Sequence, residues 1–279
     1  MEPRLIHFFS ISAIGLYSVA VFMFLVEVVG KRFWRGDLAM YFFYAAFLAH
    51  AALVFPFLFD NRFQFLQSGG DYFFWLSFAL AIAFILFRRR LQYATLGCLW
   101  GGMIILFMVS SSYLMHITSL GRFETPVGFL LSFHVLPVLV AEVCFCIAFG
   151  VSTVYLLQQR RLKNKQIEAI TLRGPSLETL ERYRGLAVQT GLIAMTFAIV
   201  SGCIWAYAHG DLFLKPDLFV WMALLAWVVL SYIQHGSAVV GWSGKKSSKI
   251  TVLITAIILL GLVCVRLFSG TIVHGNAGI

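Results

Sequence analysis

Long runs of apolar residues, separated by short polar segments, dominate the chain. A run of roughly 17–25 apolar residues, folded as a helix, crosses the ~30 Å hydrocarbon core of a bilayer. Eight runs of about this length lie at residues 6–29, 38–59, 72–87, 91–113, 127–157, 186–208, 218–234 and 250–269. Because a helix satisfies its backbone hydrogen bonds internally, the pattern predicts an all-α, polytopic bundle of about eight transmembrane helices. We expect residues 1–279 to form a single integral membrane domain.

The composition of the chain supports this prediction. Hydrophobic residues make up 61% of the 279 residues, and charged residues make up only 12%. That charged fraction is about half of the ~25% usual in soluble domains, so a water-soluble globule is excluded. The net charge of +9 would suggest nucleic acid as a partner of a soluble chain. Here the basic residues are expected in loops beside the membrane, so the expected partner is the lipid bilayer and not nucleic acid.

The basic residues fall mainly in alternate loops. Cytoplasmic loops of membrane proteins carry an excess of Lys and Arg. Of the 21 Lys and Arg residues, 16 lie in the first, third, fifth and seventh loops, and four lie on the other side. This bias predicts that both termini face outward. The first run is longer than the core of a signal peptide and has no small-residue cleavage site, so we expect it to be retained.

The longest cytoplasmic segment is predicted at residues 158–185 and begins as a basic extension of the fifth run. Ser176, which follows Pro175, is a typical N-cap residue. Glu178 and Glu181 come in the next turns, where the helix dipole favours acidic side chains. We therefore expect a basic cytoplasmic loop that contains a short amphipathic helix on the inner membrane surface.

Histidines within or beside the apolar runs are the candidate site residues, because imidazole is costly to place in hydrocarbon. His134 lies near the predicted outer end of the fifth run, and His274 follows the eighth run on the same side. His50 is expected in the outer half of the membrane, whereas His235 lies at the cytoplasmic face. Neutral imidazole ligates iron well, so the histidines at the outer face suggest a haem or metal site. For each of them, a hydrogen-bonded interfacial residue is the competing interpretation.

Several short motifs occur in order along the second half of the chain. LSFHVL at residues 131–136 is followed by LLQQRRLK at 156–163, PSLETLER at 175–182 and SGCIWA at 201–206. Asp217, Trp227 and His235 come next, and GWSGKK follows at residues 241–246. Over roughly residues 70–275 this order resembles the cytochrome c assembly family that includes CcsA, ResC and the HemX-like proteins. The resemblance implies a multi-pass protein of the bacterial cytoplasmic (inner) membrane that handles haem.

The resemblance also implies a set of haem ligands. His134 and His274 stand where the family has the axial ligands of haem iron at the outer face. His235 corresponds to the family's intramembrane ligand, and His50 is its candidate partner by the same analogy. The cofactor implied is non-covalently bound haem b.

The outer loop between the sixth and seventh runs departs from the full assembly proteins, in which it is rich in tryptophan. Trp205 remains at its start, and Asp217 keeps the acidic residue of the family's core or only caps the next helix. Arg266, eight residues before His274, is placed to pair with a haem propionate or to extend to the lipid headgroups. The degenerate loop resembles the shorter, eight-span HemX-like branch.

Three functions remain open from the sequence. The first is haem binding and delivery in cytochrome c biogenesis, with an apocytochrome c and a CcsB-like subunit as partners. The second is a HemX-like regulator of haem biosynthesis that acts on glutamyl-tRNA reductase through the basic loop. The third is a permease or structural membrane protein without haem, although Glu27 and Glu142 are the only clear carboxylates in the middle of the runs. No pattern of nucleophile and general base points to catalysis, so we do not expect an enzyme.

Overall fold

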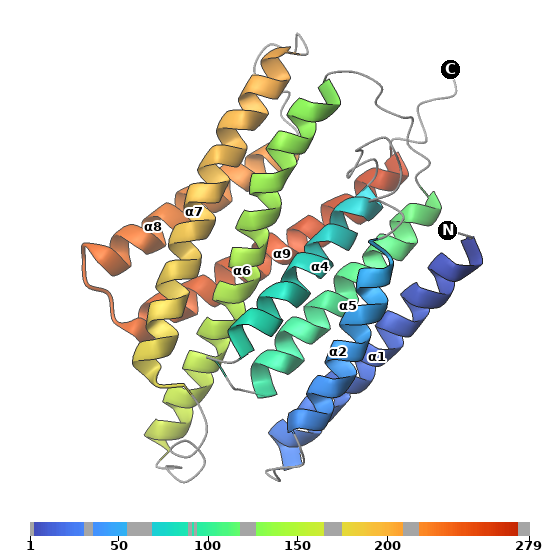
Figure 1. Ribbon diagram of the computed structural model, residues 1–279. Coiled ribbons are helices and arrows are strands. Elements are labelled where there is room, and N and C mark those ends of the chain that lie inside the picture. Colours follow the sequence, from blue (N-terminus) through green and yellow to red (C-terminus); the bar gives the residue numbers. More distant parts are fainter. Residues whose placement is uncertain are drawn as a thin grey trace. The chain divides into compact units, whose positions relative to one another are not determined.

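The computed structural model of the chain describes residues 3–30, 36–54, 69–88, 91, 94–117, 127–164, 175–208 and 218–272. Within these ranges the protein is all-helical, as predicted, and contains no strand. The helices are α1 (Pro3–Gly30), α2 (Gly36–Ala52), α4 (Gly69–Arg88), α5 (Ala94–Ile117), α6 (Val127–Lys163), α7 (Leu177–Ala208), α8 (Leu218–Ala238) and α9 (Gly244–Ile272) (Figure 1).

Seven of the helices in this described part are long and apolar enough to cross a membrane. The exception is α2, whose apolar helix runs only from Leu38 to Ala52 among the described residues. The sequence pattern predicts a longer second span that reaches residue 59, but the helix ends in a tight turn in which the Leu53 amide donates to the His50 carbonyl at 3.1 Å. A proline follows at position 56, and because proline disfavours helical geometry in the residue before it, a helix is not expected to run through position 55. Residues 55–59 lie outside the described part.

The helices divide into two compact units, Met1–Arg122 and Phe123–Ile279. In the first unit α1 packs against α2, α4 packs against α5, and α5 also packs against α1 (Figure 1). Its core is aromatic: Tyr17, Phe43, Phe73, Trp100 and Phe107 are all at most 1% exposed. Aromatic side chains bury a large apolar area each, so they stabilise a small helical unit strongly.

Two glycines allow α5 to approach α1 closely. A Cβ atom added at Gly97 would lie 2.5 Å from Cδ2 of Phe24, and one added at Gly101 would lie 2.5 Å from Cγ2 of Val21. The two glycines are four residues apart and therefore on the same face of α5. Small residues at this spacing let transmembrane helices pack backbone to backbone, where lipid offers no hydrophobic driving force.

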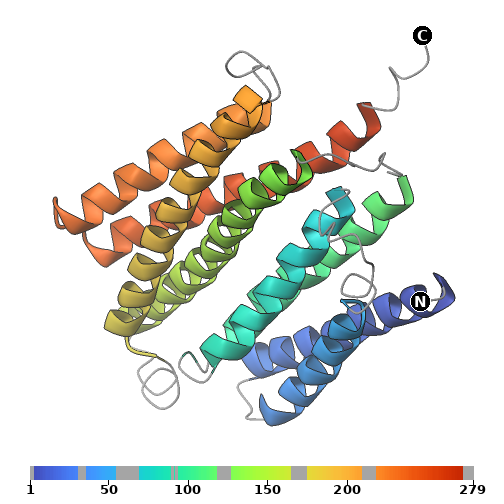
Figure 2. The ribbon, with the colours of Figure 1, turned by 45° about the horizontal axis from the view of Figure 1, so that its top comes forward.

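In the second unit α6 and α7 pair along much of their length, α9 packs on α6, and α8 joins α7 to α9 (Figure 2). The inner face of α9 is polar but satisfied. Ser247, Thr251 and Thr255 are fully buried, and each threonine hydroxyl donates to the carbonyl one turn before it, Thr251 to Ser247 at 2.9 Å and Thr255 to Thr251 at 2.6 Å. These small side chains can therefore line a helix interface within the membrane without an unpaired hydroxyl.

The predicted N-cap at Ser176 is confirmed, since the Thr179 amide donates to Ser176 Oγ at 3.1 Å. The helix that follows differs from the expected short amphipathic one, because it continues without a break through Ala208 as α7. Its first turns are packed rather than laid on a surface: Leu180 is fully buried, and Arg184 donates to the Gly244 carbonyl at 3.2 Å. These contacts to α9 tie the start of α7 to the bundle.

Candidate functional site

His134 is held between α6 and α7 by a hydrogen bond to the backbone. Its Nδ1 atom lies 2.9 Å from the carbonyl oxygen of Ala198 and 3.3 Å from Ser201 Oγ. A carbonyl oxygen only accepts hydrogen bonds, so Nδ1 carries the ring proton and donates it. The neutral ring then has its lone pair on Nε2. His134 is half-buried, whereas Ser201 is 8% exposed.

Gly202 forms the surface of α7 against which the His134 ring rests. A Cβ atom added at Gly202 would lie 2.9 Å from Cε1 and 3.2 Å from Nδ1 of His134. Any side chain at this position would push the ring away from α7 and lengthen its hydrogen bond to Ala198. The missing side chain and the backbone carbonyl together set the position and the tautomer of His134.

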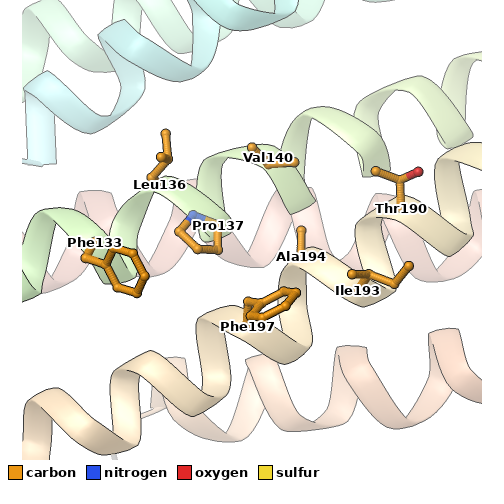
Figure 3. A pocket seen from close by; sticks show the side chains of 8 residues that line it. All are labelled: Phe133, Leu136, Pro137, Val140, Thr190, Ile193, Ala194 and Phe197. Atoms are coloured by element: carbon orange, nitrogen blue, oxygen red, sulfur yellow. The ribbon is translucent and has the colours of Figure 1, made fainter.

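An apolar groove of about 370 Å³ lies between the same two helices, α6 and α7 (Figure 3). Its lining carries one hydroxyl, that of Thr190, and is otherwise apolar. The groove is lined by Phe133, Leu136, Pro137, Val140, Thr190, Ile193, Ala194 and Phe197. Phe133 directly precedes His134, and Phe197 directly precedes Ala198, so the groove lies at the same height along α6 and α7 as the histidine. The groove offers an apolar ligand a surface at this height of α6 and α7, and His134 is not itself one of its lining residues.

His235 lies in the last turn of α8, which ends in a well-defined cap. Gly241 adopts a φ of +70°, and the Trp242 amide donates to the Gly236 carbonyl at 3.0 Å. The Trp242 ring packs directly on Gly236, where an added Cβ would lie 2.5 Å from Cδ2 of the indole. This capping geometry fixes the backbone that carries His235, while the His235 side chain itself is exposed.

The start of α9 is fixed by a buried polar cluster from α6 and α7. Arg184 of α7 is 7% exposed and donates to the Gly244 carbonyl at 3.2 Å and to Ser248 Oγ at 3.3 Å. An added Cβ at Gly244 would meet Tyr155 Oη at 2.6 Å, and it would also overlap the Glu181 carboxylate. A side chain at position 244 would therefore displace the ends of the Glu181 and Tyr155 side chains. Gly244 follows closely on the turn after His235, so the cluster and that turn lie next to each other along the chain.

His50 lies in the first unit and is 0% exposed. Its Nδ1 lies 3.5 Å from the Tyr17 hydroxyl, and its Nε2 lies 3.4 Å from Ser77 Oγ. Both ring nitrogens thus face hydroxyl groups of neighbouring helices. The surroundings differ from those of His134, because aromatic rings rather than an open groove enclose His50.

A family model described as "Cytochrome C assembly protein" matches residues 38–273, which is most of the chain. The protein belongs to the cytochrome c assembly family. Membership supports a role in cytochrome c biogenesis for this multi-pass helical membrane protein. No curated protein matches the chain closely enough to count as a relative.

The family match covers three of the candidate histidines of this cytochrome c assembly protein. It includes His50, His134 and His235, and it ends just before His274. The match begins at residue 38, earlier than the motif order alone suggests, and leaves α1 outside. Tyr17, which contacts His50, is therefore contributed by a helix that precedes the matched region.

Several predicted site residues cannot be placed in detail. Asp217 and His274 lie outside the described residues. Trp205 and Arg266 belong to α7 and α9, but their side chains lie outside the described part. Their predicted roles stay predictions, as does the pairing of His134 with His274.

Sequence reasoning missed the residues that hold His134 in place. The sequence showed Ser201 and Gly202 only as members of the SGCIWA motif. Neither residue type indicates a contact with a histidine 67 or 68 positions away. It also missed the buried role of Arg184, which the sequence pattern groups with the basic loop. Each contact had a feature in the sequence that could have indicated it. For His134 it is the pair of adjacent small residues in an apolar run, and for Arg184 it is a glutamate three residues earlier on the same helix face.

Proposed function

We propose that this protein binds haem b non-covalently at the outer face of the bacterial cytoplasmic membrane and presents it for cytochrome c biogenesis. His134 and His274 are the proposed axial ligands of the haem iron, with Trp205, Asp217 and Arg266 beside them. Family membership and the geometry of His134 support this assignment. Haem is the cargo in this proposal, so the protein acts by binding and positioning it and not as an enzyme.

The observation that carries the proposal is the hydrogen bond from His134 Nδ1 to the Ala198 carbonyl at 2.9 Å. Histidines that ligate metals usually donate their other ring N–H to a carbonyl or carboxylate, which orients the ring and raises the basicity of the ligating nitrogen. The bond places the ring proton on Nδ1 and the lone pair on Nε2, one of the two ring nitrogens through which histidine ligates metals. The apolar groove at the same height of α6 and α7 suits the edge of a porphyrin, which is flat and largely apolar.

His235 is the proposed second contact for haem, at the cytoplasmic end of α8. Its exposed side chain and its capped backbone suit a site that haem reaches from the inner leaflet. An apocytochrome c is the proposed recipient of the cargo, and a CcsB-like subunit is the proposed companion. The shorter HemX-like branch remains the proposed place of this chain within its family.

Absorption spectroscopy of the purified protein tests the proposal. The parent, produced with added haem and purified in mild detergent, is expected to show a Soret band and reduced α and β bands. His134→Ala and His274→Ala should each lower the haem content per mole of protein several-fold. His7→Ala is the matched control, because His7 is an exposed histidine of α1, and it should retain the parent spectrum. Equal haem content in all four proteins would overturn the assignment of His134 and His274.

A regulator of haem biosynthesis that acts on glutamyl-tRNA reductase is the second candidate function. The observation in its favour is that Arg160, Lys163 and Arg182 are exposed at the end of the α6–α7 pair that also carries Ser176. Basic side chains at this position offer an electrostatic docking surface for an acidic patch of a cytosolic enzyme. Capture of the reductase by the parent, but not by a variant with all three residues changed to Gln, together with no bound haem, would favour this function.

A further inference from the structure

His50 is completely buried in the first unit, at the meeting point of three helices. It comes from the last turn of α2, the Tyr17 hydroxyl comes from α1, and Ser77 comes from α4. Tyr17 and Ser77 are themselves fully buried. A polar group in such surroundings must be hydrogen-bonded, because an unpaired one loses its water without compensation.

The directions of these hydrogen bonds follow from one fixed donor. The Ser77 hydroxyl donates to the Phe74 carbonyl at 2.8 Å, so its oxygen is left to accept from the Nε2–H of His50 at 3.4 Å. The ring proton is therefore on Nε2, and Nδ1 carries the lone pair. Nδ1 then accepts from the Tyr17 hydroxyl at 3.5 Å. A directed chain runs from Tyr17 through His50 and Ser77 to the backbone of α4.

Aromatic rings close the remaining space around His50. The ring centroids of Phe74, Phe78 and Tyr17 lie 5.1, 5.2 and 6.0 Å from that of the imidazole, all at steep edge-on angles. These contacts cover the imidazole, and its 0% exposure leaves no opening for a porphyrin. An iron ligand needs a lone pair directed into a site that the metal can enter. His50 offers neither, because its one lone pair faces Tyr17.

We infer that His50 is the hydrogen-bonded hub that joins α1 to α2 and α4, and that it does not ligate haem. The haem measurement in the test below rests on the proposed function, whereas the unfolding measurements do not. It also assigns a role to α1, which lies outside the matched family region and supplies Tyr17. His134 and His50 thus differ by geometry: one is half-buried beside a groove, and the other is enclosed and doubly hydrogen-bonded.

The test combines thermal unfolding in detergent with the haem spectrum of the full chain. Tyr17→Phe removes one hydrogen bond, to His50, and Ser77→Ala removes two, to His50 and to the Phe74 carbonyl. Each substitution should lower the melting temperature by ~2–4 °C. His50→Leu should lower it further, because the buried Tyr17 hydroxyl loses its acceptor and the Ser77 oxygen loses its donor. In the His50→Leu background, Tyr17→Phe should have little added effect, since its partner is already gone. Tyr41→Phe, an exposed tyrosine of α2, is the control and should melt like the parent.

The haem content of the His50→Leu variant shows whether His50 is a structural hub or a haem ligand. If His50 is a hub, His50→Leu keeps the parent's haem content while His134→Ala loses it. A His50→Leu protein that melts like the parent but loses haem or shifts its α band would overturn the inference. Should His50→Leu fail to accumulate, His50→Gln takes its place, because glutamine keeps an N–H donor for Ser77 but is a poor iron ligand. If the parent itself binds no haem, the proposed function fails alone, and additive melting shifts for His50 and Tyr17 would still overturn the hub.

Discussion

His134 donates a hydrogen bond from Nδ1 to the carbonyl oxygen of Ala198, with the two atoms 2.9 Å apart. The acceptor is a backbone atom, so no substitution at position 198 removes it. The Ser201 hydroxyl also donates a hydrogen bond to the Ala198 carbonyl oxygen, at 3.1 Å. The orientation of the histidine therefore depends on how closely α6 approaches α7, and Gly202 is the position of α7 against which the ring rests.

Gly202→Ala is expected to disturb His134 without unfolding the protein. The new methyl group would lie 2.9 Å from Cε1 of the imidazole, so the ring must move away from the Ala198 carbonyl. We expect a several-fold loss of bound haem, measured by the Soret absorbance per mole of protein. Gly185→Ala is the matched control on the same helix, because nothing lies within 4 Å of its added Cβ. Equal haem content in the two variants would show that the ring position does not matter for binding.

Arg184→Leu is expected to destabilise the second unit. Arg184 is 7% exposed and donates to Gly244 and Ser248, and its charge faces Glu181. Without the guanidinium, the Gly244 carbonyl and the buried Ser248 hydroxyl lose their donor, which costs about 1–3 kcal/mol. The measurement is thermal unfolding in detergent, with the exposed Arg182→Leu on the same helix as the control. A shared melting temperature would mean that the cluster around Arg184 does not stabilise the fold.

Ser176→Ala should remove the N-cap of α7. The Thr179 amide would lose its acceptor, Ser176 Oγ, at 3.1 Å. Loss of an N-cap costs about 1 kcal/mol of helix stability. We expect faster hydrogen exchange in the first turn of α7, measured by mass spectrometry, and no change elsewhere. Ser176→Asp should restore protection, because aspartate is an equally good cap and is favoured by the helix dipole, and failure of that rescue would contradict the capping role.

The predicted orientation is open to a direct test by reporter fusions. Alkaline phosphatase is active only outside the cytoplasm, so its fusion after residue 279 should be active if the C-terminus faces outward. Alkaline phosphatase fused at residue 168, between α6 and α7, should be inactive. A fluorescent protein that folds only in the cytoplasm should fluoresce when it is fused at the same position. The expectation follows from the 16 basic residues in alternate loops against four on the other side. The reverse pattern would place His134 at the cytoplasmic face and would remove the basis for an outer haem site.

Much of the helical fold could be predicted from local features of the chain. Helix α6 begins at Val127 as expected, because its apolar run is long and continuous. Ser176 was recognisable as an N-cap because capping involves residues only three positions apart. Helix α2 ends at Ala52, before the predicted limit at residue 59, because apolar character alone does not mark where a helix ends.

The candidate histidines could be named from the sequence but not told apart. His50 and His134 both occur in apolar runs, and each was a candidate ligand. Their difference depends on Tyr17 and Ser77 in one case and on Ala198 and Gly202 in the other, which lie 27 to 68 residues away along the chain. Contacts between residues so far apart along the chain produce no periodic pattern in a single sequence, so they could not be predicted from it.

The sequence by itself determined that this protein is a bundle of apolar helices in a membrane, because the hydrophobic effect and the need to satisfy backbone hydrogen bonds act on each segment alone. Tertiary structure decided what each polar side chain within those helices does. It joined the start of α7 to α9 through Arg184, enclosed His50, and set His134 against a backbone carbonyl beside an apolar groove. The reason is that the state of a buried polar group depends on the partner it meets, and helix packing alone supplies that partner.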